Sequence, residues 1–194
     1  MKNKKILVTG GAGFLGSRII EGFVTQGGPR ENIFVPLSKK LDLREKNNCE
    51  KAVQGRHIVI HAAGITGGGE FHRDHPGDIL YGNLVMGVEL MEAARKAGVE
   101  KFITIGSAAE YPEHAPMPLR EEDLWQGPLE ALHAPYAAAK KILLLQGQAY
   151  RKQYGFNAIF LLPVNLYGPR DNFNPETSHV IPALIRKFIE AEER

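Results

Sequence analysis

The stretch that decides the fold of this chain reads Lys5-Ile6-Leu7-Val8-Thr9-Gly10-Gly11-Ala12-Gly13-Phe14-Leu15-Gly16. Its first five residues form an apolar run bounded by glycine, which is typical of a strand buried on both faces of a sheet. Apolar residues then recur at helical spacing, and we expect a helix from Gly13 to Gln26. Glycines between a strand and a helix allow a tight turn and a close backbone approach to a pyrophosphate. The stretch therefore predicts a dinucleotide-binding loop.

The same alternation of buried strand and helix recurs along the rest of the chain. We expect further strands at 33–35, 57–61, 101–105 and 157–162, and further helices at 44–53, 78–97, 136–154 and 181–190. Residues 64–69 are rich in glycine and residues 112–128 in proline, so we interpret both segments as loops without regular structure. The pattern predicts an α/β fold: a doubly wound, Rossmann-like parallel sheet with right-handed crossovers.

In such sheets, ligands bind outside the carboxyl ends of the strands. Five loops follow expected strand ends, namely residues 10–16, 38–40, 62–65, 106–107 and 163–166. We expect them to converge on one edge of the sheet and to form the site there.

Tyr136 and Lys140 supply the second chemical signal. Residues four apart on a helix lie on one face, so the phenol and the ammonium are expected to share one space. A free tyrosine has a pKa of about 10, and we expect the neighbouring ammonium to lower the pKa of Tyr136. Ser107, directly after the fourth strand, is a further hydroxyl for the same edge. Together with the glycine loop, these residues predict proton transfer at a carbonyl while a hydride moves.

Composition limits the remaining classes. The chain has 194 residues, enough for one α/β domain, and a net charge of +2 from 24 basic and 22 acidic residues. The charges are mixed along the chain, so no nucleic-acid partner is expected. The first apolar run is too short for a signal or membrane segment, and we expect a cytoplasmic protein without membrane contact.

Cysteine and histidine add little chemistry of their own. The single cysteine, Cys49, excludes an internal disulfide, fits a reducing compartment and lies in a polar run, so we expect no nucleophilic role. Two histidine pairs, His57 with His61 and His72 with His75, lack the cysteines or carboxylates that would complete a metal site. No metal is expected. We place His72 in a loop, where substrate contact and solvation are about equally supported.

The residues that follow the second strand distinguish NAD from NADP. An acidic residue there would bind a ribose 2′-hydroxyl and favour NAD, but this chain carries Ser38, Lys39 and Lys40, and the first carboxylate after the second strand is Asp42. Lysines and a hydroxyl suit a 2′-phosphate, so we expect NADP rather than NAD. We expect Asp42 near the adenine.

These residues resemble a known family. The glycine loop, Asp42-Leu43, Ala62-Ala63-Gly64, Ser107 and Tyr136-x-x-x-Lys140 are similar to the extended short-chain dehydrogenase/reductases, the NAD-dependent epimerase/dehydratase family. Within that group, residues 163–174 and 178–184 resemble the GDP-L-fucose synthases, NADPH-dependent 3,5-epimerases and 4-reductases of GDP-4-keto-6-deoxymannose. The resemblance implies a Rossmann domain with catalytic residues at 1–168. Residues 169–194 are then only the beginning of a substrate-binding domain.

The resemblance also implies roles. Tyr136 would protonate the C4 oxygen, Ser107 would hydrogen-bond it, and Lys140 would bind the nicotinamide ribose. His179 would be an acid/base for epimerisation, and Lys187 would approach the substrate phosphates. The cofactor-binding positions implied are Gly10, Gly13, Phe14, Leu15, Gly16, Ser38, Lys39, Lys40, Asp42, Leu43, Ala62, Ala63, Gly64, Lys140, Pro163, Asn165 and Leu166.

One position departs from the fucose synthases. They carry a cysteine two residues after the catalytic serine, whereas this chain has Ala109, and a methyl group cannot act as a base. Glu110 is adjacent, but on a strand-like segment consecutive side chains face opposite ways, so we do not expect it to substitute. Ala109 therefore argues against full 3,5-epimerisation.

The sequence thus predicts an NADP-dependent nucleotide-sugar epimerase/reductase acting at C4 of a 4-keto-6-deoxy sugar nucleotide. The alternatives are an NAD-dependent nucleotide-sugar 4-epimerase and, from another class, a non-catalytic domain that binds and senses NADP. The family resemblance implies a homodimer through the helix carrying Tyr136 and the helix before it. Apolar residues that serve either this interface or the core are Leu84, Val88, Leu90, Ile142, Leu143 and Leu145.

Overall fold

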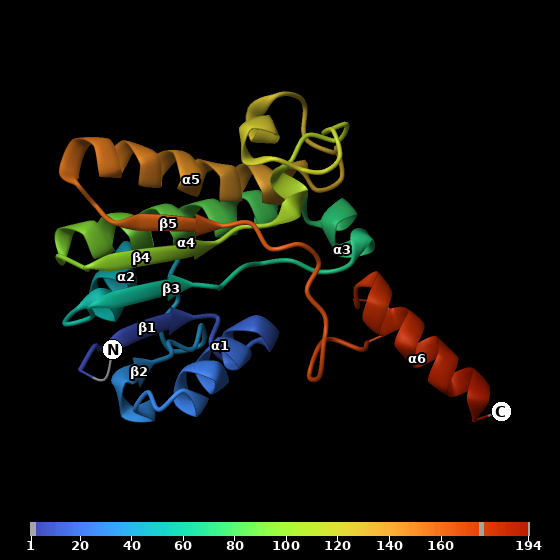
Figure 1. Ribbon diagram of the computed structural model, residues 1–194, viewed down its shortest axis with the longest axis horizontal. Coiled ribbons are helices and arrows are strands. Elements are labelled where there is room, and N and C mark those ends of the chain that lie inside the picture. Colours follow the sequence, from blue (N-terminus) through green and yellow to red (C-terminus); the bar gives the residue numbers. More distant parts are fainter. Residues whose placement is uncertain (1–2, 175–176, 194) are drawn as a thin grey trace.

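The computed structural model describes residues 3–174 and 177–193. Its centre is one five-stranded parallel sheet in the order β2-β1-β3-β4-β5 (Figure 1). The strands are β1 (Ile6–Thr9), β2 (Ile33–Phe34), β3 (Ile58–His61), β4 (Lys101–Ile105) and β5 (Ala158–Leu161). The expected α/β fold with a doubly wound parallel sheet is confirmed. The strand order reverses between β1 and β3, so ligands are expected at the crevice between these two strands.

The helices lie close to their expected positions. They are α1 (Phe14–Thr25), α2 (Lys46–Val53), α3 (Gly69–Asp74), α4 (Pro76–Lys96), α5 (Ala134–Tyr154) and α6 (Val180–Glu192), with short 3₁₀ turns η1 (Arg30–Asn32), η2 (Ala108–Glu110) and η3 (Glu121–Trp125). Among the residues described, no helix combines the length and the apolar character needed to cross a membrane.

Alternation along β1 explains why both faces of the sheet are covered. Ile6 and Val8 pack with Ile20 of α1 on one face. Leu7 points to the other face, where a larger core contains Phe102 and residues of α2, α4 and α5. Each face therefore buries its own apolar cluster, as a doubly wound sheet requires.

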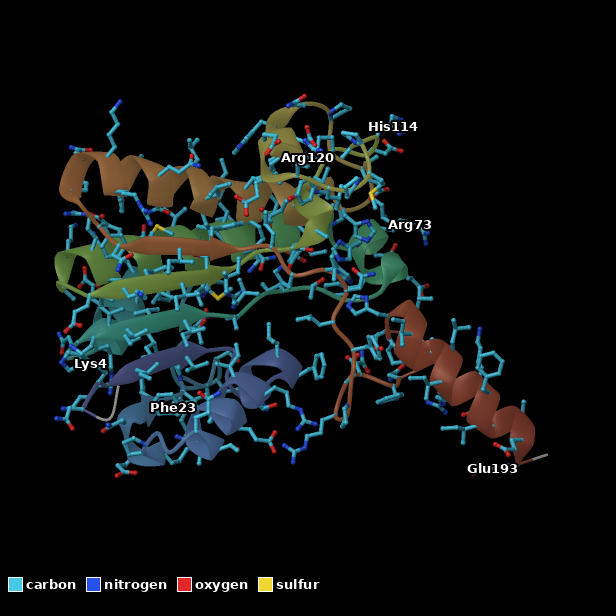
Figure 2. All side chains as sticks on the ribbon, in the orientation of Figure 1. Lys4, Phe23, Arg73, His114, Arg120 and Glu193 are labelled. Atoms are coloured by element: carbon cyan, nitrogen blue, oxygen red, sulfur yellow. The ribbon has the colours of Figure 1, made fainter. Side chains whose placement is uncertain are left out.

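Two segments that we expected to be irregular contain regular structure. The segment after β3 includes the helix α3, because Phe71 packs closely against Gly67 and His72 is buried with its Nε2 3.0 Å from Thr66 Oγ1. Arg73 of the same helix lies at the outer surface (Figure 2). The proline-rich segment contains η3, whose Leu124 is buried. In both places tertiary burial outweighs the local preference for a loop.

Helices α4 and α5 pack against each other on the larger core. Gly87 of α4 leaves room for Leu143 of α5, since an added Cβ would lie 2.5 Å from its Cδ1. Leu90 and Leu143 are fully buried, which assigns them to the core, whereas Ile142 and Leu145 are exposed. Of the two roles considered for these residues, Leu90 and Leu143 therefore have the core role.

The last helix stands apart from the sheet. After β5 the chain crosses toward α1, and α6 then projects away from the sheet, with its amino end near α3 (Figure 1). Apolar side chains of α6 remain exposed, Val180 and Phe188 by 72% each. Helix α6 therefore contributes little to the apolar cores that flank the sheet.

The packing of α1 on the glycine loop generates a prediction. An added Cβ at Gly16 would lie 2.2 Å from the Gly10 carbonyl oxygen, a backbone atom that cannot move without breaking the turn, whereas Gly22 on the same helix has open space. We expect Gly16→Ala to lower the free energy of unfolding by more than about 2 kcal/mol. The control, Gly22→Ala, should raise it by up to about 1 kcal/mol through helix propensity. Urea unfolding of the two variants measures both effects, and equal stabilities would contradict the packing described.

Candidate active site

The loops at the carboxyl ends of the strands are tied together by hydrogen bonds. The Ala63 N–H donates to Thr9 Oγ1 at 3.2 Å, which joins the ends of β3 and β1. The Ala108 N–H donates to the Pro163 carbonyl at 3.1 Å, which joins the loops after β4 and β5. The Lys140 ammonium donates to the Ala63 carbonyl at 3.4 Å and so connects α5 to this edge. The expected convergence on one edge is present.

The glycine loop makes a cradle of backbone. Gly10 has a φ of +67°, and a Cβ there would lie 2.7 Å from the Ala63 nitrogen. The Gly13 N–H donates back to the Gly10 carbonyl at 2.9 Å, and no side chain caps the amino end of α1. Free N–H groups at a helix start attract phosphate, so the loop fits the diphosphate of a dinucleotide.

A cavity of about 670 Å³ continues from this loop toward the end of β2. Its walls come from the glycine loop, the segment after β2 and the loop after β3, with Met86 of α4; they are Gly10, Ala12, Pro36, Leu37, Ser38, Lys39, Lys40, Leu41, Asp42, Leu43, Arg44, Ala63, Gly64, Ile65 and Met86. Ser38, Lys39 and Lys40 are exposed along this wall. Of the expected cofactor-binding residues in these segments, Gly10, Ser38, Lys39, Lys40, Asp42, Leu43, Ala63 and Gly64 therefore border one space, whereas Gly13, Phe14, Leu15, Gly16 and Ala62 do not line it.

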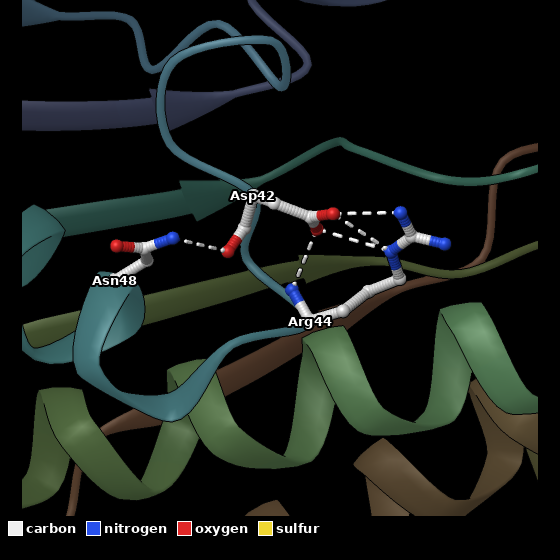
Figure 3. A network of polar contacts seen from close by, with 3 residues as sticks. All are labelled: Asp42, Arg44 and Asn48. Carbon is white, nitrogen blue, oxygen red and sulfur yellow. Dashed lines mark hydrogen bonds and ion pairs between the residues drawn. The ribbon is translucent and has the colours of Figure 1, made fainter.

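Arg44 also borders the cavity, and sequence reasoning missed it. Its guanidinium holds the Asp42 carboxylate with an Nη2–Oδ2 distance of 2.6 Å, and Asn48 Nδ2 donates to the Asp42 carbonyl at 3.0 Å (Figure 3). The hydrogen bonds from Arg44 lower the pKa of Asp42, which keeps its carboxylate ionised. The signal available in the sequence was a basic residue two positions after the first carboxylate.

Ser107 begins a tight turn at the end of β4. Its Oγ accepts the Ala109 N–H at 3.2 Å, and Glu110 Oε1 accepts the Ser107 N–H at 2.7 Å. Residues 108–110 form the 3₁₀ turn η2, so the strand-like segment that we expected is wrong. Reciprocal capping between Ser107 and Glu110 stabilises the turn instead. Ala109 is half-buried and offers no titratable group.

Tyr136 and Lys140 lie one helical turn apart on α5, as expected. The Lys140 Nζ is 5.8 Å from the centroid of the Tyr136 ring, and the Lys140 side chain is almost completely buried. Burial raises the pKa of Tyr136 to about 12, with a further contribution from Glu110, and burial lowers the pKa of Lys140 to about 8. The expected lowering of the tyrosine pKa is therefore wrong for this structure, because desolvation outweighs the ammonium.

Two histidines beside Tyr136 form a cluster that the sequence did not reveal. The ring of His72 lies 4.7 Å from that of His133 and 5.9 Å, edge-on, from that of Tyr136. His133 Nδ1 is 2.5 Å from Glu130 Oε2. Burial is the main cause that lowers the pKa of His72. Since His72 and His133 are 61 positions apart, only the contact between α3 and the start of α5 brings them together.

The remaining residues expected at the site are mostly exposed. Pro163 contacts the loop after β4 through its carbonyl, whereas Asn165 and Leu166 are exposed. His179 precedes α6, is exposed, and contributes electrostatically to the lowered pKa of His72. Lys187 is exposed on the part of α6 that projects away from the sheet (Figure 1). Neither of these last two has a contact with Ser107, Tyr136 or Lys140.

Cys49 belongs to the core. Its thiol is completely buried and donates to the Leu43 carbonyl, with an Sγ–O distance of 3.0 Å. Burial raises the pKa of this thiol to about 12, so no thiolate is available near neutral pH. Burial thus supports the expectation that Cys49 is not a nucleophile.

A dinucleotide cradle at the switch point of a parallel sheet, with a serine, a tyrosine and a lysine at the same edge, is the arrangement of a short-chain dehydrogenase/reductase. The class expected from the sequence is thereby supported on geometry. The chain belongs to the NAD dependent epimerase/dehydratase family, whose model matches residues 6–194.

Individual relatives agree with this family. A GDP-L-fucose synthase of Sinorhizobium fredii is 42% identical over 194 residues, which are 99% of this chain and 61% of that protein. Among solved structures, the GDP-mannoheptose C4 reductase MlghC of Campylobacter jejuni, with NADP bound, has a TM-score of 0.90 at 32% identity and is matched over 97% of this chain and 56% of its own. The UDP-glucose 4-epimerase of Thermus thermophilus, in complex with NAD, has a TM-score of 0.72 at 32% identity, over 94% and 60%. The chain thus spans about three fifths of these relatives.

His61, at the end of β3, generates a pH prediction. It is buried, its Nδ1 is 2.8 Å from Thr9 Oγ1, and burial lowers its pKa to about 3. Below about pH 6.5 the unfolded chain protonates this histidine and the folded chain does not. As the pH is lowered from about 6 to about 4, the free energy of unfolding should therefore fall by up to about 1.4 kcal/mol per pH unit.

The matched variants are His61→Gln, which removes the titrating group, and His114→Gln at an exposed loop position. Urea unfolding at several pH values should give a shallower slope for His61→Gln than for the unchanged chain and His114→Gln. An identical slope in all three proteins would exclude a neutral His61 in the folded state.

Proposed function

We propose that the chain carries the cofactor-binding and proton-transfer groups of an NADP-dependent nucleotide-sugar epimerase/reductase that acts at C4 of a 4-keto-6-deoxy sugar nucleotide. The observation that carries this proposal is the meeting of Ser107, Tyr136 and Lys140 with the glycine loop at one edge of the sheet. Relatives named GDP-L-fucose synthase and GDP-mannoheptose C4 reductase support the substrate class.

The proposed roles follow from the chemistry of each group. The cofactor, when bound, supplies a hydride to the carbonyl carbon. Tyr136, whose raised pKa keeps it protonated near neutral pH, donates its proton to the C4 oxygen as negative charge develops there. The Ser107 hydroxyl donates a second hydrogen bond to the same oxygen. Lys140 places a positive charge next to both and binds the nicotinamide ribose.

The cofactor is proposed to be NADP. Ser38, Lys39 and Lys40 border the cavity and suit a 2′-phosphate, while Asp42 is held by Arg44 instead of being free for a ribose hydroxyl. The solved relative MlghC has NADP bound. The other cofactor-binding residues implied by the family are proposed to serve as expected, with Pro163, Asn165 and Leu166 on the nicotinamide side.

This assignment of the phosphate-binding residues predicts a selective loss of affinity. The double variant Lys39→Ala/Lys40→Ala should weaken NADPH binding by at least about tenfold, because two cations near the 2′-phosphate are lost. NADH binding should change by less than about twofold, since NADH lacks that phosphate. Titration of cofactor fluorescence measures both affinities, with Lys96→Ala, on the far end of α4, as the control. An equal loss for the two cofactors would contradict the assignment.

Full epimerisation at both C3 and C5 is not part of this proposal. Ala109 provides no base next to Ser107, and reduction at C4 needs only the serine, the tyrosine and the lysine. His179 remains proposed as an acid/base and Lys187 as a ligand of substrate phosphate, both on residues 169–194, the proposed start of a substrate-binding domain. The relatives continue well beyond the length matched here.

One alternative has an observation in its favour. The structural likeness to the UDP-glucose 4-epimerase with NAD supports a nucleotide-sugar 4-epimerase, which also needs only Ser107, Tyr136 and Lys140. The nucleotide that copurifies with the protein separates the two: NADP favours the reductase and tightly held NAD the epimerase. A non-catalytic NADP sensor would bind the cofactor and turn over neither substrate.

A homodimer is proposed through α4 and α5. Tyr81, Ile142 and Leu145 are exposed on these helices, while their opposite sides form the core. A second copy packed on this surface would bury these side chains. A monomer at micromolar concentration in sedimentation velocity would overturn this part of the proposal.

The proposed proton donor yields the central functional prediction. Tyr136→Phe removes the phenolic proton and keeps the ring, so NADPH-dependent reduction of a GDP-4-keto-6-deoxy sugar should slow by a factor on the order of 10² to 10⁴. NADPH affinity should stay within about twofold, because the ring still fills its place beside His72. Tyr154→Phe, at the far end of the same helix, is the control. Undiminished turnover by Tyr136→Phe would exclude the proposed chemistry.

A further inference from the structure

Glu110 is the group in this site that the proposed chemistry does not use. It is completely buried, follows Ser107 by three residues, and ends the turn η2. Its Oε1 accepts the Ser107 N–H at 2.7 Å, while Ser107 Oγ accepts the Ala109 N–H at 3.2 Å. Because the Ser107 oxygen is an acceptor in this turn, its own hydroxyl proton is left to donate to a ligand.

The space around this carboxylate is closely fitted. An added Cβ at Gly106 would lie 2.6 Å from Glu110 Oε1 and 2.5 Å from Cε1 of Phe160 on β5. Gly106 therefore has no side chain where the carboxylate and the phenyl ring lie. This close fit holds Glu110 Oε1 against the backbone of Gly106 and Ser107.

The second oxygen shows that a neutral cap would have been sufficient for the turn. Glu110 Oε2 is buried and makes no hydrogen bond to the residues described. A buried carboxylate that lacks partners costs free energy, and a glutamine would cap Ser107 equally well through its amide oxygen. An ionisable group at this place is therefore explained better by the groups around it than by the turn alone.

Positive charge lies on the helix packed against this turn. Glu110 interacts electrostatically with Lys140 and Lys141 of α5, and both lysines are buried. Lys141 is already engaged with the Leu124 carbonyl at 2.5 Å, whereas the contact of Lys140 with the Ala63 carbonyl is a long 3.4 Å. Of the two lysines, Lys140 thus has the weaker hydrogen bond, and a nearby negative charge would stabilise its ammonium form more.

The other titratable groups facing this pair are few. Tyr136 of α5 and Tyr111, adjacent to Glu110, both interact with its charge, and His61 of β3 faces Lys140. Burial raises the pKa of Glu110 to about 8, against the effect of Lys140, and burial lowers the pKa of Lys140 to about 8, against the effect of Glu110. His61 stays neutral over that range, so Glu110 is the partner that changes charge with Lys140 near neutral pH.

We propose that Glu110 is a positioning residue for the Ser107–Tyr136–Lys140 trio: it holds the Ser107 turn through its backbone, and its ionised form is the buried counter-charge that favours the ammonium form of Lys140. The role rests on the proposed function, since it acts through residues assigned there. In this arrangement a single carboxyl group orients the serine hydroxyl and shifts the equilibrium between the ammonium and amine forms of Lys140.

The test separates the two parts of this role with two variants. Glu110→Gln keeps an acceptor for the Ser107 N–H and removes the charge, while Glu110→Leu removes both. Glu113→Gln, an exposed glutamate of the same loop, is the matched control. The primary measurement is the NMR titration of the Lys140 ε-carbon in the unliganded chain, with Lys140→Arg identifying the resonance.

Loss of the counter-charge disfavours the ammonium. In Glu110→Gln the Lys140 titration midpoint should therefore fall by about one pH unit relative to the unchanged chain and Glu113→Gln. The alkaline limit of NADPH binding should move to lower pH by a similar amount. Glu110→Leu should show the same shift and, in addition, a loss of turnover of about tenfold or more beyond that of Glu110→Gln, because the serine turn is no longer held.

An unchanged Lys140 midpoint in Glu110→Gln would overturn the proposal and leave Glu110 as a structural cap. Glu110→Gln decides this point even where Glu110→Leu does not fold, as circular dichroism would show. Failure of the unchanged chain to bind NADPH would contradict the proposed function instead, and the Lys140 titration would still test the counter-charge by itself.

Discussion

The site depends on a backbone approach that only glycine allows. Gly10 adopts a positive φ where the chain leaves β1, and it lies so close to the end of β3 that a Cβ would overlap the Ala62–Ala63 peptide. Gly16 brings the first turn of α1 equally close to the Gly10 carbonyl. These two contacts open the crevice between β1 and β3 and aim the free N–H groups of α1 into it. The cavity, and the Lys140 contact with Ala63, follow from this arrangement.

Burial determines the electrostatics at the same edge. Lys140 and Glu110 are removed from water, and desolvation moves their pKa values toward each other. The phenol of Tyr136 responds in the opposite sense to the simple effect of a nearby ammonium, because it loses hydration and faces the carboxylate. The sequence indicates one acid, Tyr136, and one cation, Lys140. The structure adds Glu110, which interacts electrostatically with both, so the three titrations are coupled.

How far the sequence predicts this structure depends on how local each cause is. The expected strand at 101–105 has the same bounds as β4, because a short apolar run rich in β-branched and aromatic residues is typical of a buried strand. The Tyr136 and Lys140 pairing was also predictable from helical spacing. The helix α3, the Glu110 cap and the contact between His72 and His133 were not, because each depends on which distant segment covers it. Arg44 was visible as a basic residue, but its pairing with Asp42 required the turn that joins β2 to α2.

The arrangement also separates the chemistry from the choice of substrate. Ser107 follows β4 and is held by Glu110, and Tyr136 and Lys140 lie on α5, so the groups proposed to act at C4 all belong to the part of the chain packed on the sheet. The residues proposed to bind the sugar nucleotide lie around α6, where Val180, Lys187 and Phe188 are exposed. Under the proposed function, alanine at position 109 removes one reaction at a neighbouring carbon and leaves unchanged the groups proposed to act at C4. A common sheet edge can in this way serve reductases and epimerases that differ in the residues placed around it.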